Sequence, residues 1–196
     1  AKQTKQQLAI PEDCLTIGYL GSLGTWYMLD EMLDFFTCLN RRRKSVFLFI
    51  TPDDPEHIYQ SAEQKGISRS SLRIIKGSRE QIPSLALMMD VSIFFILPAF
   101  SKMASSPTKL GEVMSLGIPV VCNSGIGDVD QVIEQEKCGV VIREFNSASY
   151  EQAITTMLEN NPQLNAEELH RSAVRQFGIE NGVHTYARLY ASLLSE

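Results

Sequence analysis

Residues that bind metals are scarce in this sequence of 196 residues. The histidines are scattered, without the short spacing of paired ligands, so the sequence predicts no metal site. The cysteines are also far apart and include no Cys-x-x-Cys pair, which favours free, buried thiols in a reducing cytoplasm. These residues are His57, His170 and His184, and Cys14, Cys38, Cys122 and Cys138.

An excess of positive charge is missing too. With 18 Lys and Arg against 23 Asp and Glu, the net charge is -5, which argues against a nucleic-acid-binding protein. The exception is the run "NRRRK" at residues 40–44. It is typical of a solvated helix end, where cations are favourable, and docking to an anionic membrane surface is the alternative.

Long apolar runs and targeting segments are likewise absent. No stretch approaches the length of a transmembrane helix, and no signal peptide is visible. The chain begins at Ala1 with the polar segment "AKQTKQQ", which we interpret as part of something longer. We expect a cytoplasmic protein, with the inner face of the membrane as a further possible location, and residues 1–13 as a linker or N-terminal extension.

The sequence does contain a regular alternation of short apolar runs and amphipathic stretches. The run "SVFLFIT" at 45–51 is typical of a parallel strand buried on both faces, whereas 28–44 has apolar residues at helical spacing. We expect strands at 15–21, 45–51, 72–77, 91–98, 118–123 and 140–145, and helices at 28–44, 52–66, 78–90, 106–117, 127–139 and over most of 147–196. This order predicts one α/β domain over residues 1–196, with a doubly wound, parallel, six-stranded Rossmann-like sheet, helices on both faces and a helical C-terminus.

The loop after the first strand, "GYLGSLGTW" (18–26), is rich in small residues. Such a loop lets backbone amides approach an anion, although the glycines equally permit a plain tight turn. The spacing is GxxGxxG rather than GxGxxG, and no Walker lysine follows, so neither an NAD site nor a P-loop is indicated. Trp26 either packs on the core at the helix start or stacks on a ligand.

The loop after the fourth strand, "LPAFSKMASSPTKLGE" (97–112), leads into a helix at the carboxyl end of the sheet, where open α/β folds bind ligands. Ser105, Ser106 and Thr108 supply hydroxyls, and Lys109 supplies a positive charge suited to phosphate. Glu112 lies one turn further on, and a carboxylate accepts hydrogen bonds from ribose hydroxyls. The alternative is structural: Ser106 caps the helix, and Lys109 with Glu112 forms a weak surface pair.

The segment "SSPTKLGEVMSLGIPVVCNSGIGDVDQVI" (105–133) resembles the donor-binding segment of retaining glycosyltransferases of family four, which have the GT-B fold. The strand "VSIFFILP" and the front loop "GYLGSLG" match the same pattern in order and spacing. The resemblance covers residues 14–194 as the C-terminal half of such an enzyme. It implies that the N-terminal acceptor-binding half is absent from this chain.

The resemblance also implies roles for single residues. Glu112 matches the second glutamate of the family's Glu-x7-Glu motif, which holds the ribose. Ser106, Thr108 and the nearby backbone would face the diphosphate and the sugar, and Gly21 with Ser22 would approach the diphosphate from the other side.

Residues 76–79, with Gly77 and Arg79, match the place where the family holds the nucleobase. Arg79 equally suits a solvated helix start. Two features depart from the family: Ala104 stands where the motif has its first glutamate, and the basic pair after the first strand is missing. Lys109 would partly replace that charge, and Asp128 is expected to cap a helix rather than face the cleft.

We therefore expect the donor-binding domain of a glycosyltransferase that moves a sugar from a nucleotide-diphosphate sugar to a polysaccharide or lipid-linked acceptor, without a metal or cofactor. The expected partners are the donor and the N-terminal half, with peripheral membrane contact of the full-length protein and no nucleic acid. The isolated chain would be inactive. The alternatives are a non-catalytic nucleotide- or sugar-binding module and a nucleotide-sugar epimerase, and a dinucleotide-binding oxidoreductase ranks last. The apolar face of 181–194 is expected to cross back onto the N-terminal half.

Overall fold

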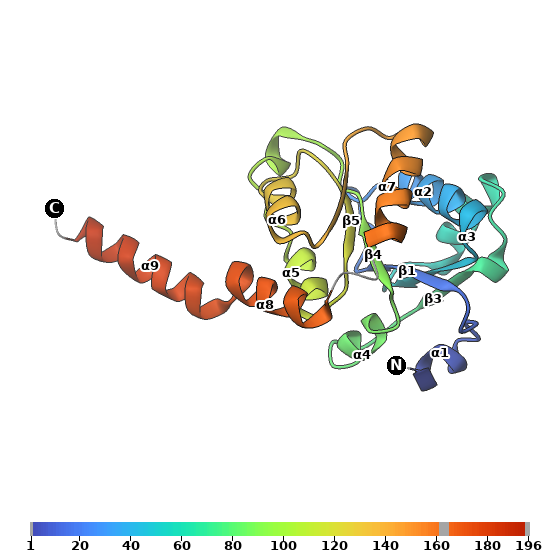
Figure 1. Cartoon of the computed structure of the whole chain (residues 1–196), viewed down its shortest axis with the longest axis horizontal. Coiled ribbons are helices and arrows are strands. Elements are labelled where there is room, and N and C mark those ends of the chain that lie inside the picture. Colours follow the sequence, from blue (N-terminus) through green and yellow to red (C-terminus); the bar gives the residue numbers. More distant parts are fainter. Residues whose placement is uncertain (1, 161–164, 195–196) are drawn as a thin grey trace.

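Six parallel strands lie at the centre of the molecule, in the order β3-β2-β1-β4-β5-β6 (Figure 1). The computed structural model describes residues 2–160 and 165–194. The strands are β1 (Leu15–Leu20), β2 (Ser45–Ile50), β3 (Leu72–Ile75), β4 (Val91–Phe94), β5 (Val120–Asn123) and β6 (Gly139–Ile142). This order confirms the predicted doubly wound sheet, and chain order reverses between the neighbouring strands β1 and β4.

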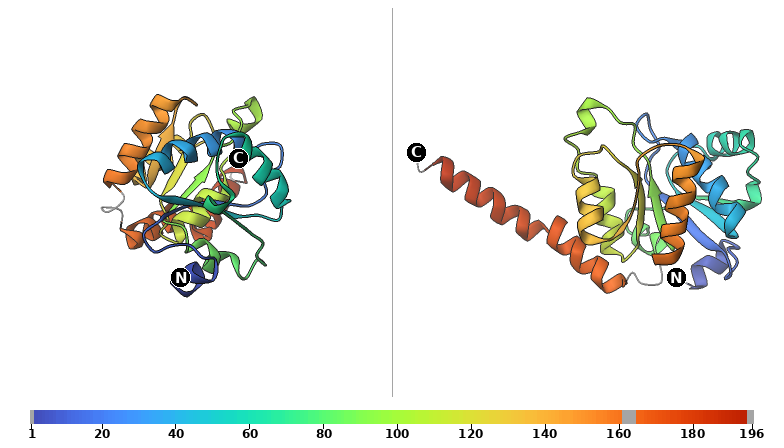
Figure 2. Two further views of the ribbon diagram at one scale, coloured as in Figure 1. Left: turned by 90° about the vertical axis from the view of Figure 1, so that its right-hand side faces the viewer. Right: turned by 45° about the horizontal axis from the view of Figure 1, so that its top comes forward.

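Helices cover both faces of this sheet (Figures 1 and 2). One face carries α2 (Leu29–Arg42), α3 (Pro55–Gln64) and α7 (Ser147–Asn160), which contact one another through α2. The other carries α5 (Thr108–Ser115), α6 (Val129–Glu136) and α8 (Ala166–Phe177), of which α8 packs on both of the others. The remaining helices are α1 (Lys2–Gln7), α4 (Ile82–Ala86), α9 (Ile179–Leu193) and the short 3-10 turns η1 (Arg69–Ser71) and η2 (Phe100–Lys102).

Burial on both faces explains why β2 is apolar after Ser45. All six residues of β2 are buried, and the ring centroids of Phe47 and Phe49 lie 4.1 Å apart. The four cysteines are free and buried as well, as predicted. The basic run at 40–44 ends α2, where Arg42 donates to Thr155 on α7 and Lys44 pairs with Asp13.

Most of the elements are shorter at one or both ends than predicted, and the causes are clear for the fourth helix region and the fourth strand. The helix expected at 78–90 is reduced to α4, because the Gln81 side chain accepts a hydrogen bond from the Ser78 N–H and Pro83 stands in the first helical turn. The fourth strand ends at Phe94 because the chain beyond it pairs with the first loop. Tyr27 and Ile96 form an antiparallel bridge, and the buried Asn123 side chain bonds both the N–H and the C=O of Ile96.

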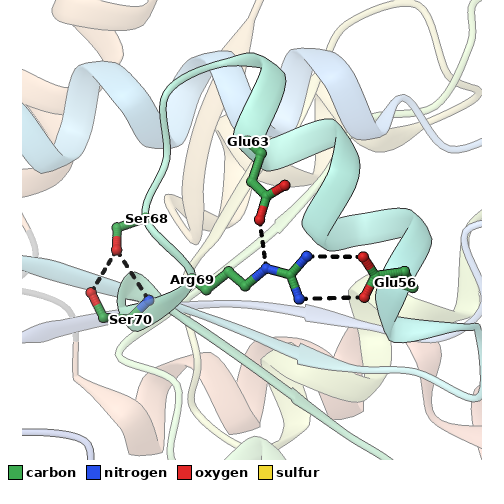
Figure 3. A network of polar contacts seen from close by, with 5 residues as sticks. All are labelled: Glu56, Glu63, Ser68, Arg69 and Ser70. Atoms are coloured by element: carbon green, nitrogen blue, oxygen red, sulfur yellow. Dashed lines mark hydrogen bonds and ion pairs between the residues drawn. The ribbon is translucent and has the colours of Figure 1, made fainter.

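Arg69 joins α3 to the turn before β3 (Figure 3). Its guanidinium lies between Glu63 and Glu56, at 2.5 and 2.9 Å, and stacks 4.6 Å from the centroid of the Tyr59 ring. These side chains are half exposed, so the network fixes a surface corner of the domain and takes no part in the cleft described below.

The last helix, α9, leaves the body of the domain. In Figure 1, α9 extends away from the sheet beyond α8, and all its large apolar side chains are exposed. None of the described helices is both long and apolar enough to cross a membrane.

The Asn123 contacts give a first testable prediction. Asn123→Ala leaves the N–H and C=O of Ile96 buried without partners, so we expect the free energy of unfolding to fall by about 2–4 kcal/mol. Asn165→Ala is the control, since Asn165 only caps α8 at the surface and its loss costs about 1 kcal/mol. Urea denaturation of both variants measures the difference, and equal losses would contradict this role of Asn123.

Candidate functional site

A cleft of about 740 Å³ opens at the carboxyl edge of the sheet, where chain order reverses between β1 and β4. The loop after β1 forms one wall, the start of α5 forms the opposite wall, and the segment around α4 lies at the side. A second cavity of about 760 Å³ borders Pro119, Gly139 and α8. Two of its arginines are already paired with lining glutamates, Arg175 with Glu136 and Arg143 with Glu134, so the first cleft is the stronger candidate.

The structure brings seven of the nine predicted site residues to this cleft. Those in its lining are Gly21, Arg79, Ser105, Ser106, Thr108, Lys109 and Glu112. Ser22 and Gly77 are not among the lining residues. The Ser22 hydroxyl donates to Asp53, and Gly77 packs against Leu85, whose Cδ1 would be 2.6 Å from a Cβ at that position.

The start of α5 lacks a side-chain cap. Pro107 holds the N-cap position, and no side chain bonds the first amides of the helix. The Ser106 hydroxyl donates instead to Asp128 at 3.3 Å, so the expectation that Ser106 caps α5 is wrong. Asp128 does stand at the N-cap position of α6, but its side chain makes no cap bond either. The first N–H groups of α5 therefore face the cleft without a side-chain acceptor, an arrangement that favours anions.

Lys109 is the most unusual residue of the cleft. It is only 7% exposed, and among the residues that the structure describes its Nζ has no hydrogen-bond partner. The amine lies 3.7 Å from the ring centroid of Tyr27 and 4.1 Å from that of Tyr19. Gly21 lies directly over it, since a Cβ at Gly21 would be 3.2 Å from Nζ. An amine between two π faces retains its donors for a ligand that enters from the cleft.

Burial changes the acidity of this amine. Desolvation lowers the pKa of Lys109 to about 7, and the nearby Glu112 carboxylate opposes that shift. Burial also raises the pKa of Tyr27, and Glu112 adds to that rise. Glu112 itself is exposed and makes no ion pair with Lys109, so the surface-pair interpretation is wrong. The two charges are separately available at one helix start.

Asp53 is a site residue that the sequence did not reveal. It lies after β2, and its carboxylate accepts from the Ser22 hydroxyl at 2.8 Å and from the Leu23 N–H at 2.5 Å. Burial acts to raise the pKa of Asp53, but these hydrogen bonds outweigh burial and the pKa lies below its ordinary value. Ser22 and Leu23 lie 31 and 30 positions before Asp53 in the sequence. The fold of α2 and β2 brings the three residues together, and no local motif signals that contact.

Trp26 stands at the rim of the cleft. Its side chain is 42% exposed, so packing on the core is wrong, and the Lys102 amine lies 4.4 Å from its ring centroid. The backbone beneath is fixed by a hydrogen bond from Leu97 N–H to the Trp26 carbonyl. The indole lines the cleft, and stacking of Trp26 on a ligand stays a prediction.

A family model described as "Glycosyl transferases group 1" matches residues 1–175. The chain belongs to this family. The predicted family and fold are confirmed, with this group 1 domain as half of a GT-B architecture. A search of curated protein sequences finds no match.

Solved glycosyltransferases share the fold of this group 1 domain at low identity. WaaG, a glycosyltransferase involved in lipopolysaccharide biosynthesis, is 21% identical with a TM-score of 0.71, over 90% of this chain and 47% of its own. A glycosyltransferase from Rickettsia africae ESF-5 is 13% identical with a TM-score of 0.76, over 98% and 51%. A mutant of S. aureus TarM, in complex with Fondaparinux, alpha-GlcNAc-glycerol and UDP, is 12% identical with a TM-score of 0.70, over 92% and 36%. The chain spans about half the length of the first two structures.

A pair of glycines tests how tightly the cleft of this group 1 domain is packed. Gly125 and Gly127 both have positive φ, so alanine strains the backbone at either position by about 1 kcal/mol. A Cβ at Gly127 would lie 1.7 Å from the Ser105 carbonyl oxygen, whereas nothing lies within 4 Å at Gly125. We expect Gly127→Ala to lower the melting temperature clearly more than Gly125→Ala. Equal losses in a thermal melt would contradict the close contact between the two loops.

The acidity of Lys109 predicts a pH dependence of stability. The pKa falls from 10.5 in the unfolded chain to about 7 in the folded one, so between these values the unfolded state binds more protons. The free energy of unfolding should rise with pH there, by up to about 1.4 kcal/mol per pH unit relative to Lys109→Met. Denaturation curves of both proteins from pH 7 to 10 measure this difference, in which the titration of tyrosines and cysteines cancels. Lys102→Met, at the cleft rim, is the control, and parallel curves for wild type and Lys109→Met would overturn the prediction.

Proposed function

We propose that this chain is the donor-binding half of a retaining, metal-independent glycosyltransferase, which binds a nucleotide-diphosphate sugar in the cleft at the carboxyl edge of the sheet. The observation that carries the proposal is the buried, unpartnered amine of Lys109 beside the uncapped start of α5. A buried amine without an acceptor is costly in free energy, and a bound diphosphate supplies the missing acceptor.

The roles of the other cleft residues follow from their positions. The hydroxyls of Ser105, Ser106 and Thr108 lie along the same wall as Lys109 and supply contacts to the phosphates and the sugar. Glu112, exposed one turn along α5, accepts hydrogen bonds from the ribose hydroxyls. Arg79 lines the side of the cleft near α4, where the nucleobase is expected. UDP in the TarM complex supports a nucleoside diphosphate as the ligand.

The chemistry proposed for this cleft is transfer of the sugar to a polysaccharide or lipid-linked hydroxyl. The bond between the anomeric carbon and the diphosphate oxygen breaks, and its electron pair goes to the leaving diphosphate. The acceptor oxygen bonds the anomeric carbon, and its proton goes to the leaving group. Lys109 and the α5 amides stabilise the negative charge that develops on the diphosphate, which is electrostatic catalysis. The acceptor would bind to the N-terminal half of the full-length enzyme, in the cytoplasm.

A non-catalytic nucleotide- or sugar-binding module is the second candidate, because Ala104 stands in the loop where the family has a glutamate. A nucleotide-sugar epimerase is less favoured, because His57, His170 and His184 all lie outside the lining of the cleft. Sugar transfer by the full-length protein, with radiolabelled donors, distinguishes the enzyme from the module.

Calorimetry with UDP, GDP and ADP and with the matching nucleosides tests the site itself. We expect one of the diphosphates to bind. Lys109→Met should weaken binding of that diphosphate by about tenfold with little effect on binding of the nucleoside, and Glu112→Ala should weaken binding of both. Because binding favours the charged amine, Lys109 should also take up a proton when the diphosphate binds near pH 8. Titrations in buffers of different ionisation enthalpy detect this uptake. Glu134→Ala, on α6, is the control. No binding of any diphosphate, or unchanged binding in both cleft variants, would refute the proposal.

A further inference from the structure

The loop between β1 and α2 already holds an anion that belongs to the protein. The carboxylate of Asp53 accepts from the Ser22 hydroxyl through Oδ1 and from the Leu23 N–H through Oδ2. The Asp53 N–H donates to the buried Thr51 hydroxyl at 3.1 Å, which ties Asp53 to the end of β2. The Asp53 carboxylate thus occupies two donors, the Ser22 hydroxyl and the Leu23 N–H, that a glycine-rich loop would offer to a phosphate.

Two further hydrogen bonds hold the start of this loop to the protein. The Gly21 N–H donates to the Ile50 carbonyl at 2.9 Å, and the Tyr19 hydroxyl donates to the Ser22 carbonyl at 2.7 Å. The loop is therefore held to the ends of β1 and β2. In this position, Gly21 lies over Nζ of Lys109.

We propose that Asp53 is a positioning residue that holds the Gly21 to Leu23 loop closed over Lys109, so that a diphosphate is bound by Lys109 and the start of α5 rather than by the loop. This inference rests on the proposed function for its ligand. It assigns the two walls different tasks, since the loop holds Lys109 in place and Lys109 with the start of α5 supplies the contacts. Asp53 touches no ligand and acts through the loop.

The neighbouring Asp54 provides a matched control. Asp54 is also an aspartate of the loop before α3, but its side chain accepts only from the Glu56 N–H, as the N-cap of α3. Asp53→Asn and Asp54→Asn remove the same charge one residue apart. Only the first changes the contact with Ser22 and Leu23.

The first experiment needs no ligand. The titration of Lys109 is followed by NMR of its labelled side chain, assigned by comparison with Lys109→Met, in the 196-residue chain. Opening of the loop hydrates the amine, so we expect Asp53→Asn to raise the midpoint from about 7 toward 10.5 and Asp54→Asn to leave it unchanged. Loss of the carboxylate charge alone would lower the midpoint, so a rise in the midpoint indicates that the loop has opened. An unchanged or lowered midpoint in Asp53→Asn overturns the proposal.

The second experiment measures ligand binding. The ligands are whichever of UDP, GDP and ADP the unchanged chain binds, and the matching nucleoside. We expect Asp53→Asn to weaken binding of the diphosphate by about tenfold and binding of the nucleoside by less than about twofold. Asp54→Asn should change neither affinity. Equal weakening of both ligands, or equal weakening by both variants, assigns Asp53 a merely structural role and overturns the proposal. If the unchanged chain binds no diphosphate, the proposed function fails, and the ligand-free titration still decides the role of Asp53.

Ser22→Ala covers the case in which Asp53→Asn does not fold. Ser22 is exposed, and its loss removes one of the two donors to Asp53 while the Leu23 N–H remains. We expect a smaller change in the same direction, a rise of the Lys109 midpoint and about threefold weaker diphosphate binding. Wild-type behaviour in both measurements would overturn the proposal.

Discussion

The burial of one amine between two tyrosine rings is the constraint on which the cleft depends. Lys109 comes from α5, whereas Tyr19 ends β1 and Tyr27 precedes α2, so three elements must meet at one point. The reversal of chain order between β1 and β4 supplies that point, because it leaves the loops after these strands facing one another. Gly21 is required above the amine, since its φ is +111° and a Cβ at this position would lie only 3.2 Å from Nζ.

An unpaired amine in this position lowers the stability of the ligand-free domain. Desolvation of an ammonium is only partly offset by aromatic faces, and the lowered pKa of Lys109 expresses the remaining cost. Domains of this size have little stability to spare, so such a group is best explained by a ligand that compensates for it. The ion pairs elsewhere differ in this respect: Arg69 has its acceptors in place without any ligand.

The fold and the α5 wall of the cleft could be predicted from the sequence for a clear physical reason. Apolar runs such as β2 report burial directly, and the residues of α5 are neighbours in the chain. The tasks of Ser22 and Asp53 could not be read, because their contact joins the ends of two strands and depends on which way each side chain turns. The early end of β4 was missed for the same reason: its last apolar residues pair with the first loop through Tyr27 rather than with β5.

The absence of a carboxylate at position 104 fits the state of Lys109. A second carboxylate in the loop before α5 would compete with a phosphate for the amine and raise its pKa in the free protein. With Ala104 there, and with the Asp53 carboxylate saturated by its own loop, Glu112 is left as the acidic group of the described cleft lining, against the cations Lys102 and Arg79. Lys109, with its pKa of about 7, gains a proton when an anion binds. The cleft thus keeps a positive potential beside an uncapped helix start, which favours a dianionic ligand over a neutral sugar.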